Sequence, residues 1–336
     1  MLRHRHIPTL LLALLAAALA AGCKKELPKG SPAAWLEDAT ALEEQGDYFQ
    51  EDREQAPLGA LEYYRLCLEA APGTFNEERM TQIRQRVQWL SALKLVLTED
   101  FMGKCDYQGA IAAMTQFLKD WPDSPYSRLA LFYRGLAREY DVDYQDTAGA
   151  IADYQAFLEN NPDDPLAPEV RVRIGHCYEF DLDKPDYDKA IETYDDTIAK
   201  YGPKVEELNV RADDVTDVEH LPELMAVERA LYNKARILED HLAQTRTDQP
   251  RDCYEQAAEC YHRLMDERFF GTIRFKQSQF VYFRYAVLLA EKLDRPQEGI
   301  DVLKTMEKRW PESPMYGRAK WKREQIEKTV AAAKPS

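Results

Sequence analysis

The chain has 336 residues, of which 45% are hydrophobic and 31% are charged, and its formal net charge is −15. This acidic balance excludes binding to nucleic acid through phosphate contacts and electrostatic binding to anionic lipid surfaces, because both require an excess of Lys and Arg. With 14 glycines and few alternating Val/Ile runs, the composition favours helices over sheets.

The first 22 residues predict a secretory signal and not part of the fold. Arg3 and Arg5 make the start basic, and the Leu/Ala run that follows over 9–21 is shorter than the ~20 residues that a membrane-spanning helix needs. The run ends in LAAG before Cys23, which resembles a bacterial lipobox, and the resemblance implies that Cys23 carries a diacylglyceryl anchor. The alternatives are an ordinary signal peptide cleaved nearby or an uncleaved anchor.

The segment after the cysteine predicts a tether. Residues 23–32 contain lysines, prolines and a glycine without apolar periodicity, as a short linker between lipid and fold would. No aspartate follows Cys23, and the lipobox resemblance then implies an outer-membrane protein that faces the periplasm. Such a protein would be attached to the membrane through its lipid alone.

The rest of the chain predicts one helical domain over 33–330. Apolar periodicity and Pro or Gly breaks divide it into elements. The expected helices cover 34–56, 57–72, 76–101, two units of 40 residues up to about 202, 222–243, 252–269, 276–293 and 314–330. Residues 203–221 read as an acidic insertion, and 331–336 as a disordered tail.

A repeated frame organises these helices, and DYQGAIAAMTQFLKDWPDSP (106–125) is its clearest copy. A small residue is followed four positions later by an apolar residue, three later by another, and five later by a helix break. Six copies fit this frame, and their small residues are Ala60, Ala110, Ala150, Ala190, Ala257 and Gly299. Such self-similarity predicts an array in which each hairpin buries its apolar face against its neighbours.

This frame resembles the tetratricopeptide repeat family, whose first-helix glycine matches Gly135 and Gly175. The resemblance implies an all-α, right-handed superhelix (solenoid) of helical hairpins. The spacing exceeds the family's period by several residues because DVDYQDT and DLDKPDY are inserted between paired helices.

No residue pattern indicates catalysis. Cys67, Cys177 and Cys260 lie in amphipathic patterns and are expected in the core. The histidines form no metal motif, and no nucleophile or phosphate loop is recognisable, so we expect no cofactor, metal or small-molecule substrate. A lipoprotein hydrolase with a site built across repeats is the alternative class.

In the tetratricopeptide family, the first helix of each hairpin lines a concave groove for a protein or peptide partner. Carrying over its offsets from Gly135 and Gly175 gives six candidate groove residues: Phe132, Leu136, Glu139, Val172, His176 and Glu179. The alternative is that Phe132 and Leu136 belong to the core.

Lipobox and repeats together resemble the outer-membrane assembly lipoproteins of the BamD (YfiO) type. That resemblance implies a non-catalytic adaptor that binds a cell-envelope partner during outer-membrane protein assembly. The alternative is a division coordinator of the CpoB (YbgF) type, whose repeats share the signature.

Overall fold

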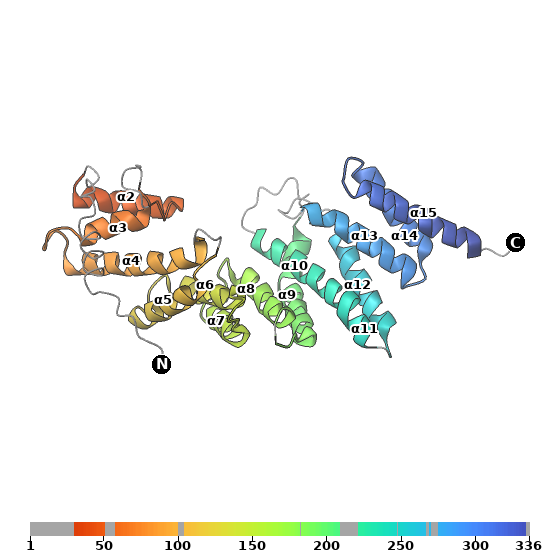
Figure 1. Ribbon diagram of the computed structural model, residues 1–336, viewed down its shortest axis with the longest axis horizontal. Helices are drawn as coiled ribbons and strands as arrows, with labels where there is room; N and C mark the ends of the chain where they lie inside the picture. The colour runs from red at the N-terminus through yellow and green to blue at the C-terminus, as the bar shows by residue number, and fades with distance from the viewer. Residues whose placement is uncertain are drawn as a thin grey trace, which may run out of the picture. The chain divides into compact units, whose positions relative to one another are not determined.

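A computed structural model describes residues 30–50, 58–99, 104–181, 183–208, 221–246, 248–266, 269 and 275–333. Within these ranges the regular secondary structure is helical and contains no strand, so the expected all-α class is confirmed (Figure 1). The signal segment, Cys23 and most of the tether lie outside the described residues.

The helices follow one another along the chain, and each packs mainly against its neighbours in sequence, as a helical repeat requires. They are α2 (Pro32–Gln45), α3 (Ala60–Leu68), α4 (Glu77–Leu97), α5 (Tyr107–Asp120), α6 (Ser127–Tyr140), α7 (Thr147–Asn160), α8 (Ala167–Glu179), α9 (Tyr187–Glu207), α10 (Leu221–Ile237), α11 (Ala243–Thr245), α12 (Pro250–Leu264), α13 (Phe275–Glu291), α14 (Pro296–Arg309) and α15 (Tyr316–Ala333). A π-helical turn, Leu238–Leu242, joins α10 to α11.

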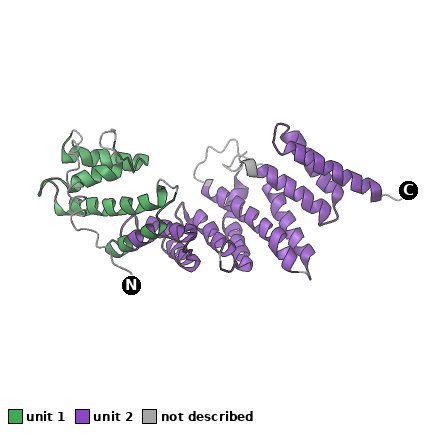
Figure 2. Cartoon of the chain, in the orientation of Figure 1, with its two compact units in different colours: residues 1–109, 116–122 green, residues 110–115, 123–336 purple. Residues whose placement is uncertain are grey.

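The chain divides into two compact units (Figure 2). Unit 1 comprises the residues up to 109 and 116–122, and in it α3 packs against both α2 and α4. Unit 2 comprises 110–115 and 123–336, and its helices from α6 to α10 and from α12 to α15 pack in order along the chain.

Aspartate caps set the start of three helices at intervals of 40 residues. The side chains of Asp106, Asp146 and Asp186 each accept a hydrogen bond from the backbone N–H three positions later, at 2.8, 2.9 and 3.1 Å. Each bond satisfies one of the N–H groups that the first helical turn leaves without a partner. The repeat period is therefore encoded in the caps as well as in the apolar frame.

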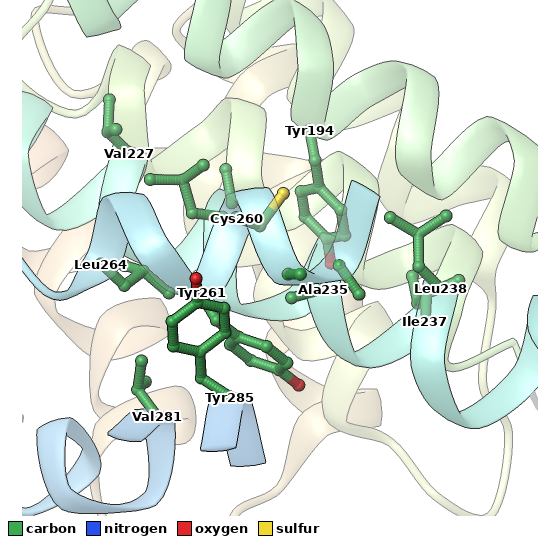
Figure 3. Close-up of a cluster of buried hydrophobic side chains, with 14 of the residues drawn as sticks. Tyr194, Val227, Ala235, Ile237, Leu238, Cys260, Tyr261, Leu264, Val281 and Tyr285 are labelled. Carbon is green, nitrogen blue, oxygen red and sulfur yellow. The ribbon is translucent and has the colours of Figure 1, made fainter. Parts of the chain in front are cut away.

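The small residues of the frame lie in the core. Ala110, Ala150 and Ala190 are fully buried, as are the aromatic residues Tyr154 and Phe157 that follow Ala150 on the same face of α7. A methyl side chain at each of these positions lets a neighbouring helix approach closely. In unit 2 the core continues through α9, α10, α12 and α13, where Tyr261 lies among Leu264, Val281 and other apolar side chains (Figure 3).

Several helix boundaries differ from the sequence-based expectation, and two of these differences have a clear physical reason. The helix expected over 34–56 ends at Gln45, because Gly46 takes a left-handed conformation with φ of 82° and caps it. The helix expected to end near Gly202 continues through Pro203 to Glu207. Tyr201 and Val205 are buried in the unit 2 core, and this burial offsets the backbone hydrogen bond that a proline removes. The rest of the expected insertion, 209–220, lies outside the described residues.

The last helix has the character of a cap. Along α15 only Ala319 and Ile326 are buried, and most of its other residues are polar or charged. In helical arrays, a largely polar face of this kind is typical of a capping repeat.

Candidate protein-binding surface

Four buried tyrosines each donate a hydrogen bond to a glutamate in the preceding helical segment, with O–O distances of 2.6 to 2.9 Å. The pairs are Tyr64–Glu43 in unit 1 and Tyr154–Glu139, Tyr194–Glu179 and Tyr261–Glu239 in unit 2. A small residue precedes each glutamate by four positions, and in order these are Ala39, Gly135, Gly175 and Ala235. This spacing places the small residue and the glutamate on one face of the helix.

The two glycines are needed because a tyrosine ring lies directly on their helix. A Cβ atom added at Gly135 would come within 2.6 Å of the Tyr154 ring, and one at Gly175 within 2.5 Å of the Tyr194 ring. The close approach brings the tyrosine hydroxyl one helical turn further along, to the glutamate.

An arginine from a helix further along the same unit completes each group, and we call the four groups Tyr–Glu–Arg triads. The ion pairs are Arg86–Glu43, Arg173–Glu139, Arg236–Glu179 and Arg284–Glu239. A buried carboxylate needs both a cation and hydrogen-bond donors, because its loss of hydration is otherwise unfavourable by several kcal/mol. The triads thus tie each hairpin to the next through polar groups within the core.

Glu139 illustrates the electrostatics of a triad. It accepts hydrogen bonds from Tyr154 at 2.8 Å and Arg173 at 3.1 Å, and the Nδ1 atom of His176 lies 2.8 Å from its Oε1. Burial by itself would raise the pKa of Glu139, but the bonds from His176 and Tyr154 and the charge of Arg173 outweigh it. The net pKa is lower than that of an ordinary glutamate, so Glu139 is an anion at neutral pH.

The structure places four of the six expected groove residues in the interior. Phe132 is 7% exposed and Val172 is fully buried, and both belong to the hydrophobic core of unit 2. Glu139 and Glu179 are buried triad members. The groove expectation therefore needs correction for these four, because their side chains contact other helices and present no open surface to a partner.

The other two expected residues, Leu136 and His176, are half-buried. Leu136 packs on the edge of the core cluster that contains Phe132, in line with the alternative that it is a core residue. The His176 ring packs against the Phe180 ring, with 4.4 Å between the centroids and 42° between the ring planes. Of the six residues, His176 thus leads to a surface that the sequence analysis missed.

Four large apolar side chains are exposed at the C-terminal ends of α6 and α8 and in the loop that follows α6. Tyr140 is 44% exposed, Val142 78%, Tyr144 70% and Phe180 43%. We call these four residues, together with His176, the aromatic patch. A sequence signal for it exists, since Tyr140 and Phe180 directly follow the triad glutamates of two helices and are 40 residues apart.

Polar contacts hold the two loops of the patch together. The Gln145 side chain donates a hydrogen bond to the Phe180 carbonyl at 3.2 Å, which ties the loop after α6 to the loop after α8. Arg173 donates to the Tyr140 hydroxyl at 2.7 Å and also stacks on its ring. Arg236 stacks on the Phe180 ring, 5.3 Å from its centroid. Both arginines are triad members, so the buried ion pairs also hold the Tyr140 and Phe180 side chains in position.

The possible metal ligands and the cysteine thiols complete the chemical survey of the described residues. Among them, no group of three His, Cys, Asp or Glu side chains is placed to hold a metal ion. Burial raises the pKa of the Cys67 and Cys260 thiols to about 11 and that of Cys177 still further, so these thiols are protonated and unreactive at neutral pH. This agrees with the expected core positions of all three cysteines, which are buried.

Comparison with known proteins adds no identification, since neither a protein-family model nor a curated protein matches the chain. Within the described part of the chain, none of the helices has the length and hydropathy to cross a membrane.

Proposed function

We propose that this protein is a non-catalytic adaptor of the tetratricopeptide-like class that binds segments of other proteins at the aromatic patch. The observation that carries the proposal is the exposure of Tyr140, Val142, Tyr144 and Phe180 at the ends of α6 and α8 and in the loop after α6, which a hydrogen bond from Gln145 links to Phe180. Tyrosines and other large apolar side chains supply most of the binding energy in protein interfaces. Soluble surfaces seldom expose several of them together without such a role.

Two features favour a binding protein over a hydrolase built across repeats. The triad carboxylates of unit 2 (Glu139, Glu179 and Glu239) are engaged by arginines and tyrosines, which leaves them unsuited to act as general bases. Burial raises the pKa of the Cys177 and Cys260 thiols, which makes them poor nucleophiles at neutral pH.

We further propose that the hairpins wind into a right-handed superhelix and that a lipid on Cys23 attaches the chain to the outer membrane, facing the periplasm. The lipobox-like end of the signal segment and the repeat frame support this proposal. The pathway that fits both features is outer-membrane protein assembly, with cell-division coordination as the second candidate. A pull-down from detergent-solubilised membranes separates the two, because β-barrel insertion components would be recovered in the first case and division proteins in the second.

Selection from a random peptide display library tests the patch directly. We expect peptides that bind the full mature protein and lose at least tenfold in affinity for a variant with Val142→Ser and Tyr144→Ser. A matched control carries Phe280→Ser and Trp321→Ser, which replace two other exposed apolar residues, on α13 and α15. The proposal fails if no peptide is enriched, or if the two variants bind the selected peptides equally well.

A further inference from the structure

The cations beside the aromatic patch are already neutralised. Arg173 pairs with Glu139 and Glu169, and Arg236 pairs with Glu179. Their guanidinium groups stack on patch rings but have little uncompensated charge to offer a partner. An acidic partner segment would therefore find few free cations at this surface.

The carboxylates of the loops after α6 and α8, unlike these arginines, are largely not neutralised by ion pairs in the described part of the chain. Asp143 and Asp183 are exposed, and neither has an ion-pair partner among the residues that the structure describes. Asp181 is half-exposed, and one of its oxygens accepts hydrogen bonds from the backbone N–H groups of Asp183 and Lys184 at 2.9 and 3.2 Å. Lys184 is the exposed cation in the same loop. Together these residues give the rim of the patch a negative charge.

We propose, building on the function proposed above, that the patch recognises a protein segment in which Lys or Arg flanks a large apolar side chain. The apolar anchor lies among Val142, Tyr144 and Phe180. The flanking cations approach Asp143 and Asp183 and stack on exposed tyrosine rings, an arrangement that attracts both Arg and Lys. Acidic segments and anionic lipid surfaces are repelled by the same carboxylates, and the net charge of −15 adds to this repulsion at long range.

Tyr140, Phe180 and His176 of the patch are held in place before a partner arrives. Arg173 holds the Tyr140 hydroxyl, and the His176 ring packs on Phe180 while its Nδ1 atom is held at Glu139. Side chains fixed in this way lose less conformational freedom on binding, so a short segment can bind measurably.

Binding of synthetic peptides to the full mature protein tests the proposal. The probes are fluorescein-labelled Gly-Lys-Arg-Trp-Leu-Arg-Lys-Gly, a neutral peptide with Gln in place of each Lys and Arg, and an acidic peptide with Glu at the same places. We expect the basic peptide to bind most tightly and to lose affinity as salt is raised. The variant with Asp143→Asn and Asp183→Asn should bind the basic peptide roughly two- to thirtyfold more weakly, as expected for the loss of two partly exposed ion pairs.

A matched control keeps the same change in net charge. Asp123→Asn with Asp163→Asn alters two exposed aspartates in the turns before α6 and α8, at the opposite ends of the helices whose final residues carry the patch. This control should leave the affinity for the basic peptide within about twofold of wild type. Asp123 and Asp163 lie at the ends of α6 and α8 that are far from the patch, and salt screens their charges over that distance.

The outcomes separate this inference from the function on which it rests. Equal binding of the basic and neutral peptides, both lost in the Val142→Ser and Tyr144→Ser variant, would overturn the charge preference and leave the patch as a binding surface. Tighter binding of the acidic peptide would overturn it as well. If the basic peptide binds but the patch variant retains it, the site is elsewhere and both proposals fail.

Discussion

Replacing Glu139 with Gln tests whether the Tyr–Glu–Arg triads stabilise the array. The variant keeps the shape of the side chain but removes the charge that Arg173 neutralises, in a place where the Glu139 side chain is 4% exposed. Breaking one partner of a buried ion pair destabilises proteins by about 3–5 kcal/mol. Arg173 retains Glu169 at 2.8 Å, which compensates in part, so we expect a loss of about 2–4 kcal/mol.

Urea denaturation followed by circular dichroism measures this loss, and hydrogen exchange locates it. Because each hairpin contacts only its neighbours, protection should fall first in α6, α7 and α8. Tyr154→Phe, which removes only the hydroxyl, should cost about 1.5–3 kcal/mol, as for other hydrogen bonds to a charged group.

The control is Glu192→Gln, which removes an exposed carboxylate on α9 and should change stability by less than about 0.5 kcal/mol. If Glu139→Gln and Glu192→Gln unfold at the same urea concentration, the triad is dispensable and the reasoning from buried charge is wrong. A loss of protection confined to α13–α15 would also contradict it.

Three further predictions concern the titration of Glu139, the packing of Ala150 and the lipidation of Cys23. Since the pKa of Glu139 is lowered in the folded state, its contribution to stability is present above about pH 4.3 and is lost as the pH falls through the folded value. Wild type should therefore lose stability below that pH more steeply than Glu139→Gln in acid titrations at fixed urea, and parallel curves would contradict the assignment. Ala150→Leu should destabilise by about 1–3 kcal/mol in thermal unfolding, because Ala150 is fully buried and a larger side chain overpacks the contact; an unchanged midpoint would speak against it. Cys23→Ala should abolish labelling with a radioactive fatty acid and leave unprocessed precursor, whereas labelling that persists would rule out the lipid anchor.

The aromatic patch could not be identified from the local sequence pattern alone. Tyr140 and Phe180 occupy equivalent places 40 residues apart, but their spacing alone does not say which loops meet. The hydrogen bond from Gln145 to the Phe180 carbonyl joins the two loops, and it depends on how α6, α7 and α8 stack.

Features that depend on neighbours along the chain could be predicted from the sequence. The small residues Ala110, Ala150 and Ala190 act within one or two helical turns, so their period of 40 residues was enough to indicate all-α hairpins. The aspartate caps with the same period were recognised only in the structure.

Which apolar side chains face the interior depends on how the helices pack, and the local pattern does not show this. Phe132 was expected to line a groove, but in the structure its side chain is buried between helices. The centroid of its ring lies 6.3 Å from that of Tyr154 and 6.4 Å from that of Phe157. Likewise Pro203 lies within α9 because the buried residues around it outweigh a lost backbone bond. Both outcomes depend on contacts between helices, whose free energy is absent from the local pattern and arises only when the hairpins stack.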